Sequence, residues 1–101
     1  MNLFEMPNCL PDGEQTDVLL TGNTRIERIL SSGQTSDWYD QSEDEWVCVL
    51  RGEGELEYED GSTQRLRAGD TAYLPAHLRH RVSYTSVPCI WLCVFRPAES
   101  L

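Results

Sequence analysis

The chain has 101 residues, of which 40% are hydrophobic and 25% charged, a composition typical of one folded domain with a single modest core. Its net charge of −9 argues against a nucleic acid or an anionic membrane as partner, because such binding depends on Lys and Arg neutralising phosphates. No apolar segment reaches the ~20 residues of a membrane helix, and residues 1–15 lack the basic start and apolar run of a signal peptide. We therefore expect one cytoplasmic domain spanning residues 1–101.

The first third of the chain predicts an irregular arm followed by strands. Residues 1–16 contain two prolines and the turn pair Asp12-Gly13, which is typical of an irregular N-terminal arm. A short apolar run, residues 18–20, ends at a Gly-Asn turn signal. The apolar spacing of residues 24–31 fits a helix about as well as a strand, but the breaks on either side leave too little room for a helix. We predict a strand there.

Two later strands are predicted to be apolar on both faces. Residues 45–50 place Val47 and Val49 on the same side as Glu45, and three further apolar residues on the other side. Residues 90–95 show the same two-sided pattern. A sheet that is apolar on both faces must be covered on both. We therefore expect one sheet face to pack on a second subunit, which makes a homodimer.

Residues 53–67 predict a β-hairpin around Asp60-Gly61, and the sequence also predicts its register. Only a loop with an odd number of residues puts the apolar side chains on one face and opposite charges together on the other. We expect a three-residue loop formed by residues 60–62. The predicted cross-strand pairs are then Leu56 with Leu66, Glu57 with Arg65, and Glu55 with Arg67.

The last third of the chain predicts a short strand over residues 71–74, a corner at residues 75–77 and a longer strand after it. From position 79 onward polar and apolar residues alternate cleanly, so His80, Val82 and Tyr84 share one face. We expect His80 to point inward together with two core residues. Because no segment clearly favours a helix, the pattern indicates an all-β sandwich or barrel.

The four cysteines show no Cys-x-x-Cys spacing. Three of them lie inside apolar, strand-like runs, where a thiol behaves as a small hydrophobic group. Without a secretory signal, we expect all four to be reduced and structural. They are poor metal ligands, because no two lie at the spacing of a zinc finger or ribbon. The cysteines are Cys9, Cys48, Cys89 and Cys93.

Two segments resemble the motifs of the cupin family, whose members are double-sheet antiparallel jelly-roll barrels. The first family motif is a glycine, five residues, His-x-His, three or four residues, a glutamate, six residues and a glycine. In this chain those positions are Gly33, Tyr39, Gln41, Glu45 and Gly52. The spacing agrees at each position, but Tyr39 and Gln41 stand where the family has histidines.

The second family motif is a glycine, five residues, Pro-x-Gly, two residues, a histidine, three residues and an asparagine. The matching positions are Gly69, Pro75, His77 in place of the second glycine, His80, and Tyr84 in place of the asparagine. The resemblance covers about residues 24–96. It implies an all-β fold, a double-sheet antiparallel jelly-roll barrel.

By position, the resemblance implies a divalent metal ion held by Gln41, Glu45 and His80, with Tyr39 near the remaining ligand place. The usual set of three histidines and one glutamate is not available, because the chain has only two histidines. One imidazole, one carboxylate and one amide include no soft ligand, so the set suits Zn, Mn, Fe or Ni without deciding among them. The reduced number of histidines lowers the expected affinity.

Each of these residues also has a purely structural interpretation. An inward histidine is commonly bonded to a nearby carbonyl, but the motif position and the alternation favour a site at His80. A carboxylate is costly to bury unless it is paired or binds a cation, which favours Glu45 as a ligand. For Gln41 a backbone hydrogen bond is as good an interpretation as ligation, and Tyr39 is more readily a pocket wall than a ligand.

We expect His77, Tyr84 and Trp38 to line the pocket, with His77 as a fourth ligand, a partner of a ligand or a general base. The function these observations favour is a metal-binding cupin that takes a small molecule as ligand or substrate, with oxygenase and isomerase as the activities considered. The alternative is a metal-free module that binds or senses a small molecule without catalysis. A third, weaker alternative is a structural dimer with a vestigial site.

Overall fold

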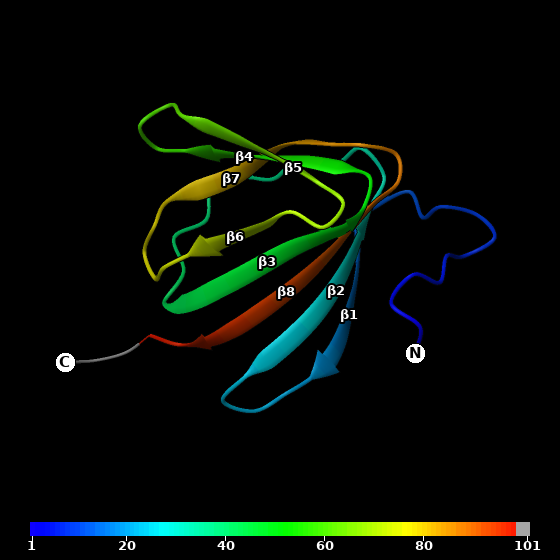
Figure 1. The fold of residues 1–101 in the computed structure, drawn as a ribbon, viewed down its shortest axis with the longest axis horizontal. Helices are drawn as coiled ribbons and strands as arrows, with labels where there is room; N and C mark the ends of the chain where they lie inside the picture. The colour runs from blue at the N-terminus through cyan, green and yellow to red at the C-terminus, as the bar shows by residue number, and fades with distance from the viewer. Residues whose placement is uncertain (99–101) are drawn as a thin grey trace.

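The computed structural model describes residues 1–98, and within this range the chain forms two antiparallel sheets and no helix. The larger sheet has the strand order β1-β2-β8-β3-β6 and the smaller one β5-β4-β7, and Figure 1 shows the smaller sheet above the larger. None of the described residues lies in a helix that could cross a membrane. The strands are β1 (Gln15–Leu20), β2 (Arg25–Ser31), β3 (Glu43–Arg51), β4 (Glu53–Tyr58), β5 (Thr63–Arg67), β6 (Thr71–Leu74), β7 (His80–Thr85) and β8 (Cys89–Pro97).

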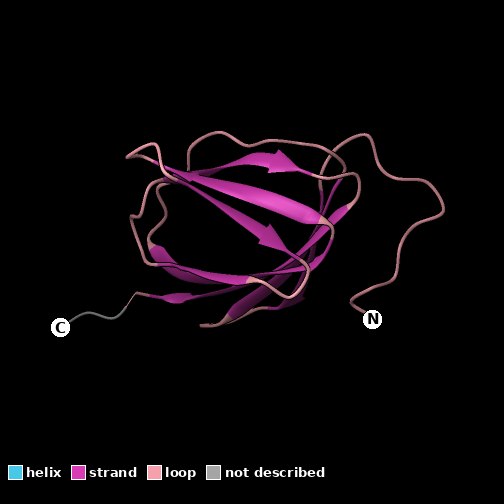
Figure 2. Ribbon diagram, turned by 45° about the horizontal axis from the view of Figure 1, so that its top comes forward, coloured by secondary structure: helices cyan, strands magenta, loops and turns pink. Residues whose placement is uncertain are grey.

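The core lies between the facing surfaces of the two sheets, which Figure 2 shows as two layers of strands. Val47 and Val49 on β3 point into it and are fully buried, as the alternation along this strand predicts. Leu56 and Leu66 close the core from the smaller sheet. The fold predicted from the sequence, an all-β double-sheet antiparallel jelly-roll, is confirmed.

A glycine lets the two sheets approach each other closely at one place. Gly54 on β4 faces the indole ring of Trp91 on β8, and a Cβ atom at position 54 would overlap that ring. Trp91 is almost completely buried and forms part of the core. The missing side chain on β4 therefore makes the space that a tryptophan on the opposite sheet fills.

The folded part of the chain begins earlier than the sequence indicates, because β1 starts at Gln15 and pairs with β2. The arm before it is held by Arg28, a buried side chain on β2. Its Nε donates to the carbonyl of Leu3 at 3.0 Å, and one Nη donates to the carbonyl of Glu5. The other Nη lies 3.4 Å from a carboxylate oxygen of Asp17 on β1. A buried guanidinium thus ties the arm to the sheet.

The β4–β5 hairpin has the predicted odd loop, but the predicted pairs are wrong by two residues. The backbone N–H of Tyr58 donates to the carbonyl of Ser62, so the three loop residues are 59–61 and not 60–62. Gly61 has a φ of 87° and occupies the last loop position, where this type of loop requires a left-handed residue. The predicted pairs would have moved the glycine to the middle of the loop.

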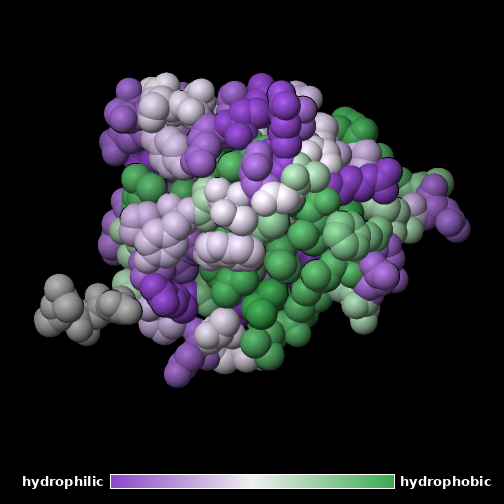
Figure 3. All heavy atoms as spheres, viewed as in Figure 1, coloured by the Kyte–Doolittle hydropathy of each residue, from purple (hydrophilic) through white to green (hydrophobic). Residues whose placement is uncertain are grey.

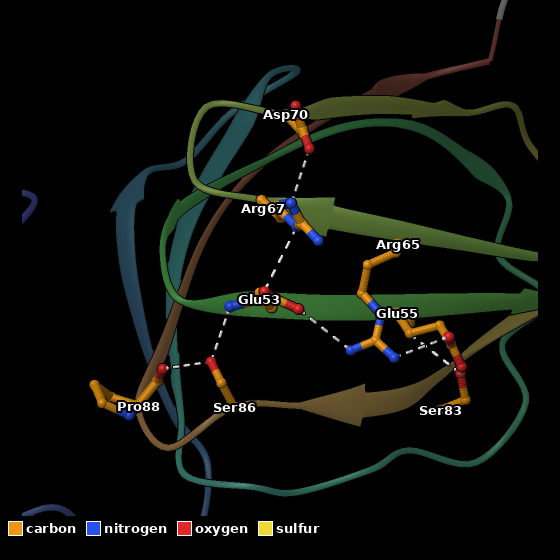
Figure 4. A network of polar contacts seen from close by, with 8 residues as sticks. All are labelled: Glu53, Glu55, Arg65, Arg67, Asp70, Ser83, Ser86 and Pro88. Carbon is orange, nitrogen blue, oxygen red and sulfur yellow. Dashed lines mark hydrogen bonds and ion pairs between the residues drawn. The ribbon is translucent and has the colours of Figure 1, made fainter.

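This shift changes which residues pair across the hairpin, but each side chain stays on the face of the sheet that was predicted for it. Glu55 pairs with Arg65 and Glu53 with Arg67, in place of the predicted pairs Glu57–Arg65 and Glu55–Arg67. Figure 4 shows the resulting network on the outer face, with one guanidinium reaching two carboxylates at 3.4 Å. Because the shift is an even number of residues, the apolar side chains still point into the core.

A β-bulge on β7 overturns the predicted orientation of Tyr84. The pairing with β4 skips Ser83, so that Val82 faces Leu56 and Tyr84 faces Glu55. The extra residue reverses the alternation. Tyr84 therefore lies on the outer face, 41% exposed, with the guanidinium of Arg65 4.5 Å from its ring centroid. The prediction that Tyr84 points inward with Val82 is wrong.

Candidate functional site

A cavity of about 350 Å³ lies between the two sheets, and it brings together the four residues that the sequence nominated as ligands. Tyr39 and Gln41 come from the loop before β3, Glu45 from β3 and His80 from the start of β7. Most of the remaining wall is apolar, with Trp91 as its largest side chain. A concave apolar cavity with a few converging polar groups is the usual form of a small-molecule site.

Glu45 is the buried acid of this cavity, with 7% of its surface exposed. Gln41 donates from Nε2 to its Oε1 at 3.1 Å, and the thiol of Cys93 on β8 is a second hydrogen-bond donor to the carboxylate. Burial raises the pKa of Glu45, while the bonds from Gln41 and Cys93 and the nearby His80 act in the opposite direction. The effect of burial is the largest of these, so the pKa of Glu45 is raised and the site favours a proton or a cation on this carboxylate.

His80 lies at the opposite wall, 3% exposed. Its Nδ1 is 2.8 Å from the carbonyl oxygen of Leu78, a bond in which Nδ1–H is the donor. This bond occupies Nδ1 and leaves Nε2 as the ring nitrogen that could bind a metal ion, the arrangement that metal-binding histidines commonly show. The predicted inward orientation of His80 agrees with its place in the cavity wall.

Tyr39 is fixed beside His80 by the main chain. The two residues form an isolated antiparallel bridge, with N–H to carbonyl distances of 2.7 and 3.1 Å, and their ring centroids are 5.5 Å apart. Partial burial raises the pKa of the Tyr39 phenol, with Glu14 and Glu45 adding to the shift and a bond to Ser36 opposing it. Tyr39 therefore keeps its proton and serves as a hydrogen-bonding wall.

The three residues predicted to line the pocket do not line this cavity. His77, with its side chain 70% exposed, bonds Asp40 at 2.7 Å and adopts a left-handed backbone with a φ of 65°, which fits a position that is glycine in the cupin motif. The ring of Trp38 lies beneath the guanidinium groups of Arg79 and Arg81. Tyr84, as described above, is on the outer face.

Sequence reasoning missed two features of the cavity. Cys93 was expected to be only a core residue, yet its thiol contacts Glu45. Arg25 on β2 lies in the cavity wall, where its Nη atoms donate to both carboxylate oxygens of Glu43 at 2.9 and 3.0 Å. Strand alternation placed neither residue against the site, because the register between strands far apart in the chain was unknown.

The cavity offers two strong donors of the kind that a divalent cation takes. The Glu45 carboxylate and the His80 imidazole line the same cavity, and the raised pKa of Glu45 marks a carboxylate without a full counter-charge. Among residues 1–98 no three His, Cys, Asp or Glu side chains are grouped so that they could hold a metal ion. A third protein ligand would therefore be the amide oxygen of Gln41, whose nitrogen is turned toward Glu45.

Comparison with known proteins places this geometry in context. Residues 26–95 match the family model described as cupin domain, and no curated protein sequence matches the chain. A solved structure from Ralstonia eutropha JMP134, described as a "putative mannose-6-phosphate isomerase", is 42% identical over 97% of both chains, with a TM-score of 0.88.

Two more distant solved structures share the fold alone. A cupin superfamily protein from Desulfitobacterium hafniense DCB-2 is 15% identical over 92% of this chain and 84% of its own, with a TM-score of 0.80. Ectoine synthase from P. lautus is 24% identical over 91% of this chain and 70% of its own, with a TM-score of 0.72. The fold that the spacing of the two sequence motifs implies is the fold that these proteins share.

Proposed function

This chain belongs to the cupin domain family, and from that premise we propose that it binds a divalent metal ion and a small polar molecule in the cavity between its sheets. The observation that carries the proposal is the convergence of Glu45 and His80, two buried residues 35 positions apart in the chain, on one cavity. The oxygen and nitrogen donors suit Zn, Mn, Fe or Ni. With only two strong donors, we expect weaker binding than at a site with four.

The surrounding residues support this role. The bond from His80 to the carbonyl of Leu78 holds the imidazole in one orientation, and Gln41 does the same for Glu45. A bound metal ion would supply Lewis acidity toward a ligand oxygen. The phenol of Tyr39 at the cavity wall would donate a hydrogen bond to the ligand, and the apolar wall would limit the access of water.

As reaction class we propose an isomerase or an oxygenase acting on a small polar substrate. The first is suggested by the printed description of the Ralstonia relative, and the second by the combination of a metal ion with a largely apolar cavity. The fold itself does not decide between them. Assays of aldose–ketose isomerisation and of oxygen consumption, each with a panel of neutral and phosphorylated small polar substrates, would separate the two.

Metal analysis of the purified protein tests the metal site. We expect close to one metal ion per chain in the wild type, after reloading if necessary, and a loss of at least about tenfold in affinity for Glu45→Gln and for His80→Ala. His77→Asn is the matched control, because the second histidine of the chain is exposed and lies outside the cavity lining, and asparagine tolerates its left-handed backbone.

A wild type that holds no metal after reloading would contradict the metal proposal, and so would a His77→Asn variant that loses metal as His80→Ala does. In the first case the second candidate function applies, a metal-free cupin that binds or senses a small molecule. One observation favours this candidate: Gln41 and Cys93 both donate to Glu45, so the carboxylate has hydrogen-bond partners without a cation.

A further inference from the structure

The charged part of the cavity lining is mostly acidic. Four glutamates line it, Glu14, Glu27, Glu43 and Glu45, and the only arginine among its lining residues is Arg25. The chain contains no lysine, so all eight of its basic residues are arginines. Arg25 is therefore the one arginine or lysine that the described lining offers to a negatively charged ligand.

Arg25 is already occupied by the protein's own carboxylates. Its Nε donates to Glu27 at 2.9 Å, and its two Nη atoms donate to the two oxygens of Glu43 at 3.0 and 2.9 Å. The guanidinium also lies over the ring of Phe95, 4.3 Å from the ring centroid. A ligand anion would have to displace Glu43 from a bidentate pair before it could bind Arg25.

We infer that this cavity discriminates against phosphate-bearing and other dianionic ligands and favours neutral or positively charged molecules of the same shape. The inference rests on the proposed function, because it concerns the same cavity and states the charge class of its ligand. Its physical basis is like-charge repulsion by the carboxylates of the lining, around a guanidinium that already pairs with two of them.

Three hexoses of similar shape and different charge test the inference: glucose 6-phosphate, glucose and glucosamine. Their binding is measured by titration calorimetry at one fixed, low ionic strength, since salt screens charges at the rim. We expect glucose 6-phosphate and inorganic phosphate to bind the wild type at least about tenfold more weakly than glucose does. In Glu43→Gln, which keeps the shape of the side chain and frees the guanidinium of Arg25, the affinity for glucose 6-phosphate should rise at least about tenfold.

Glu53→Gln is the matched control. Glu53 is also a strand glutamate paired with arginines, but it lies on the outer face of the smaller sheet (Figure 4). The inference is overturned if the wild type binds glucose 6-phosphate more tightly than glucose. It is equally overturned if Glu43→Gln gains no more affinity for the phosphate-bearing probes than Glu53→Gln does, including no gain at all.

The test separates this inference from the metal proposal. Metal content is measured on the wild-type samples used for calorimetry, and the titrations are repeated after chelation. Absence of metal in the wild type would remove the metal proposal and leave the difference between Glu43→Gln and Glu53→Gln standing. A wild type that holds metal but prefers the phosphorylated hexose, before and after chelation, would overturn the charge inference alone.

Discussion

At the scale of single residues, burial changes the acid–base behaviour of the thiols in this barrel. Burial raises the pKa of Cys89 to about 12, against an opposing bond from Ser86, and raises that of Cys93 well above its ordinary value. All four cysteines of the chain are free, in agreement with the expectation from the sequence. Both buried thiols therefore remain protonated in the folded state over a pH range in which an unfolded chain loses those protons.

This difference predicts alkaline destabilisation. Above pH 9 the unfolded state binds fewer protons than the folded state, so the free energy of unfolding falls as pH rises, by up to ~1.4 kcal/mol per pH unit for each buried thiol. Urea unfolding at pH 8 and pH 10 measures the slope. We expect Cys89→Ala to reduce it and Cys9→Ala, at an exposed thiol, to leave it unchanged. Equal slopes in the wild type and Cys89→Ala would contradict the prediction.

Residue by residue, the sequence predicts only part of the candidate site. Strand alternation and the motif positions are enough to put Glu45 and His80 in the cavity wall, because side chains two apart on a strand share a face. They are not enough for Arg25 and Cys93, which reach the site by cross-strand contact. His77 could not be placed either, since its direction depends on a left-handed backbone that the sequence pattern does not encode.

At the scale of elements, the strands and their faces are predictable, whereas two local irregularities are not. Residues 24–31 were predicted to be a strand, and β2 covers Arg25–Ser31. The hairpin register was predicted wrongly because Gly61 takes the last loop position and shifts the pairs by two. Tyr84 was placed on the wrong face because one extra residue, Ser83, enters β7 as a bulge. Periodicity counts residues and does not detect such insertions.

The contact between β4 and β8 gives a prediction at this scale. Gly54→Ala would drive a methyl group into the ring of Trp91, and we expect the free energy of unfolding to fall by about 1–3 kcal/mol because a packed core resists added volume. Chemical denaturation measures the change. Gly13→Ala is the control, since a Cβ atom there would meet nothing within 4 Å. A Gly54→Ala variant as stable as Gly13→Ala would show that the sheets are not in this contact.

At the scale of the whole molecule, an apolar row crosses all five strands of the larger sheet. Cross-strand pairing aligns Leu20, Ile26, Val94, Trp46 and Tyr73 in this row. Three of the five, Leu20, Trp46 and Tyr73, are exposed. Figure 3 shows hydrophobic residues gathered over β2 and β8 on the face drawn there. An apolar surface of this extent on a folded protein commonly marks an interface.

We therefore propose that this row covers its counterpart in a second copy of the chain, forming the homodimer that the two-sided strands predict. Light scattering should give twice the chain mass of 11.5 kDa for the wild type. Trp46→Glu should shift the protein to the monomer, because it places a charge in the centre of the interface. Tyr84→Glu, on the outer face of the other sheet, is the control. A monomeric wild type would contradict the proposal.

The buried guanidinium of Arg28 has a practical consequence for handling this protein. Two of its hydrogen-bond acceptors are the main-chain carbonyls at positions 3 and 5. These first residues therefore attach the arm to β2 through their main chain. Trimming them would remove two of the acceptors of this guanidinium and leave it with Asp17 and water, a loss of hydrogen bonds that removing a loose tail would not cause. Expression variants should keep those first residues intact, however dispensable they look in the printed sequence.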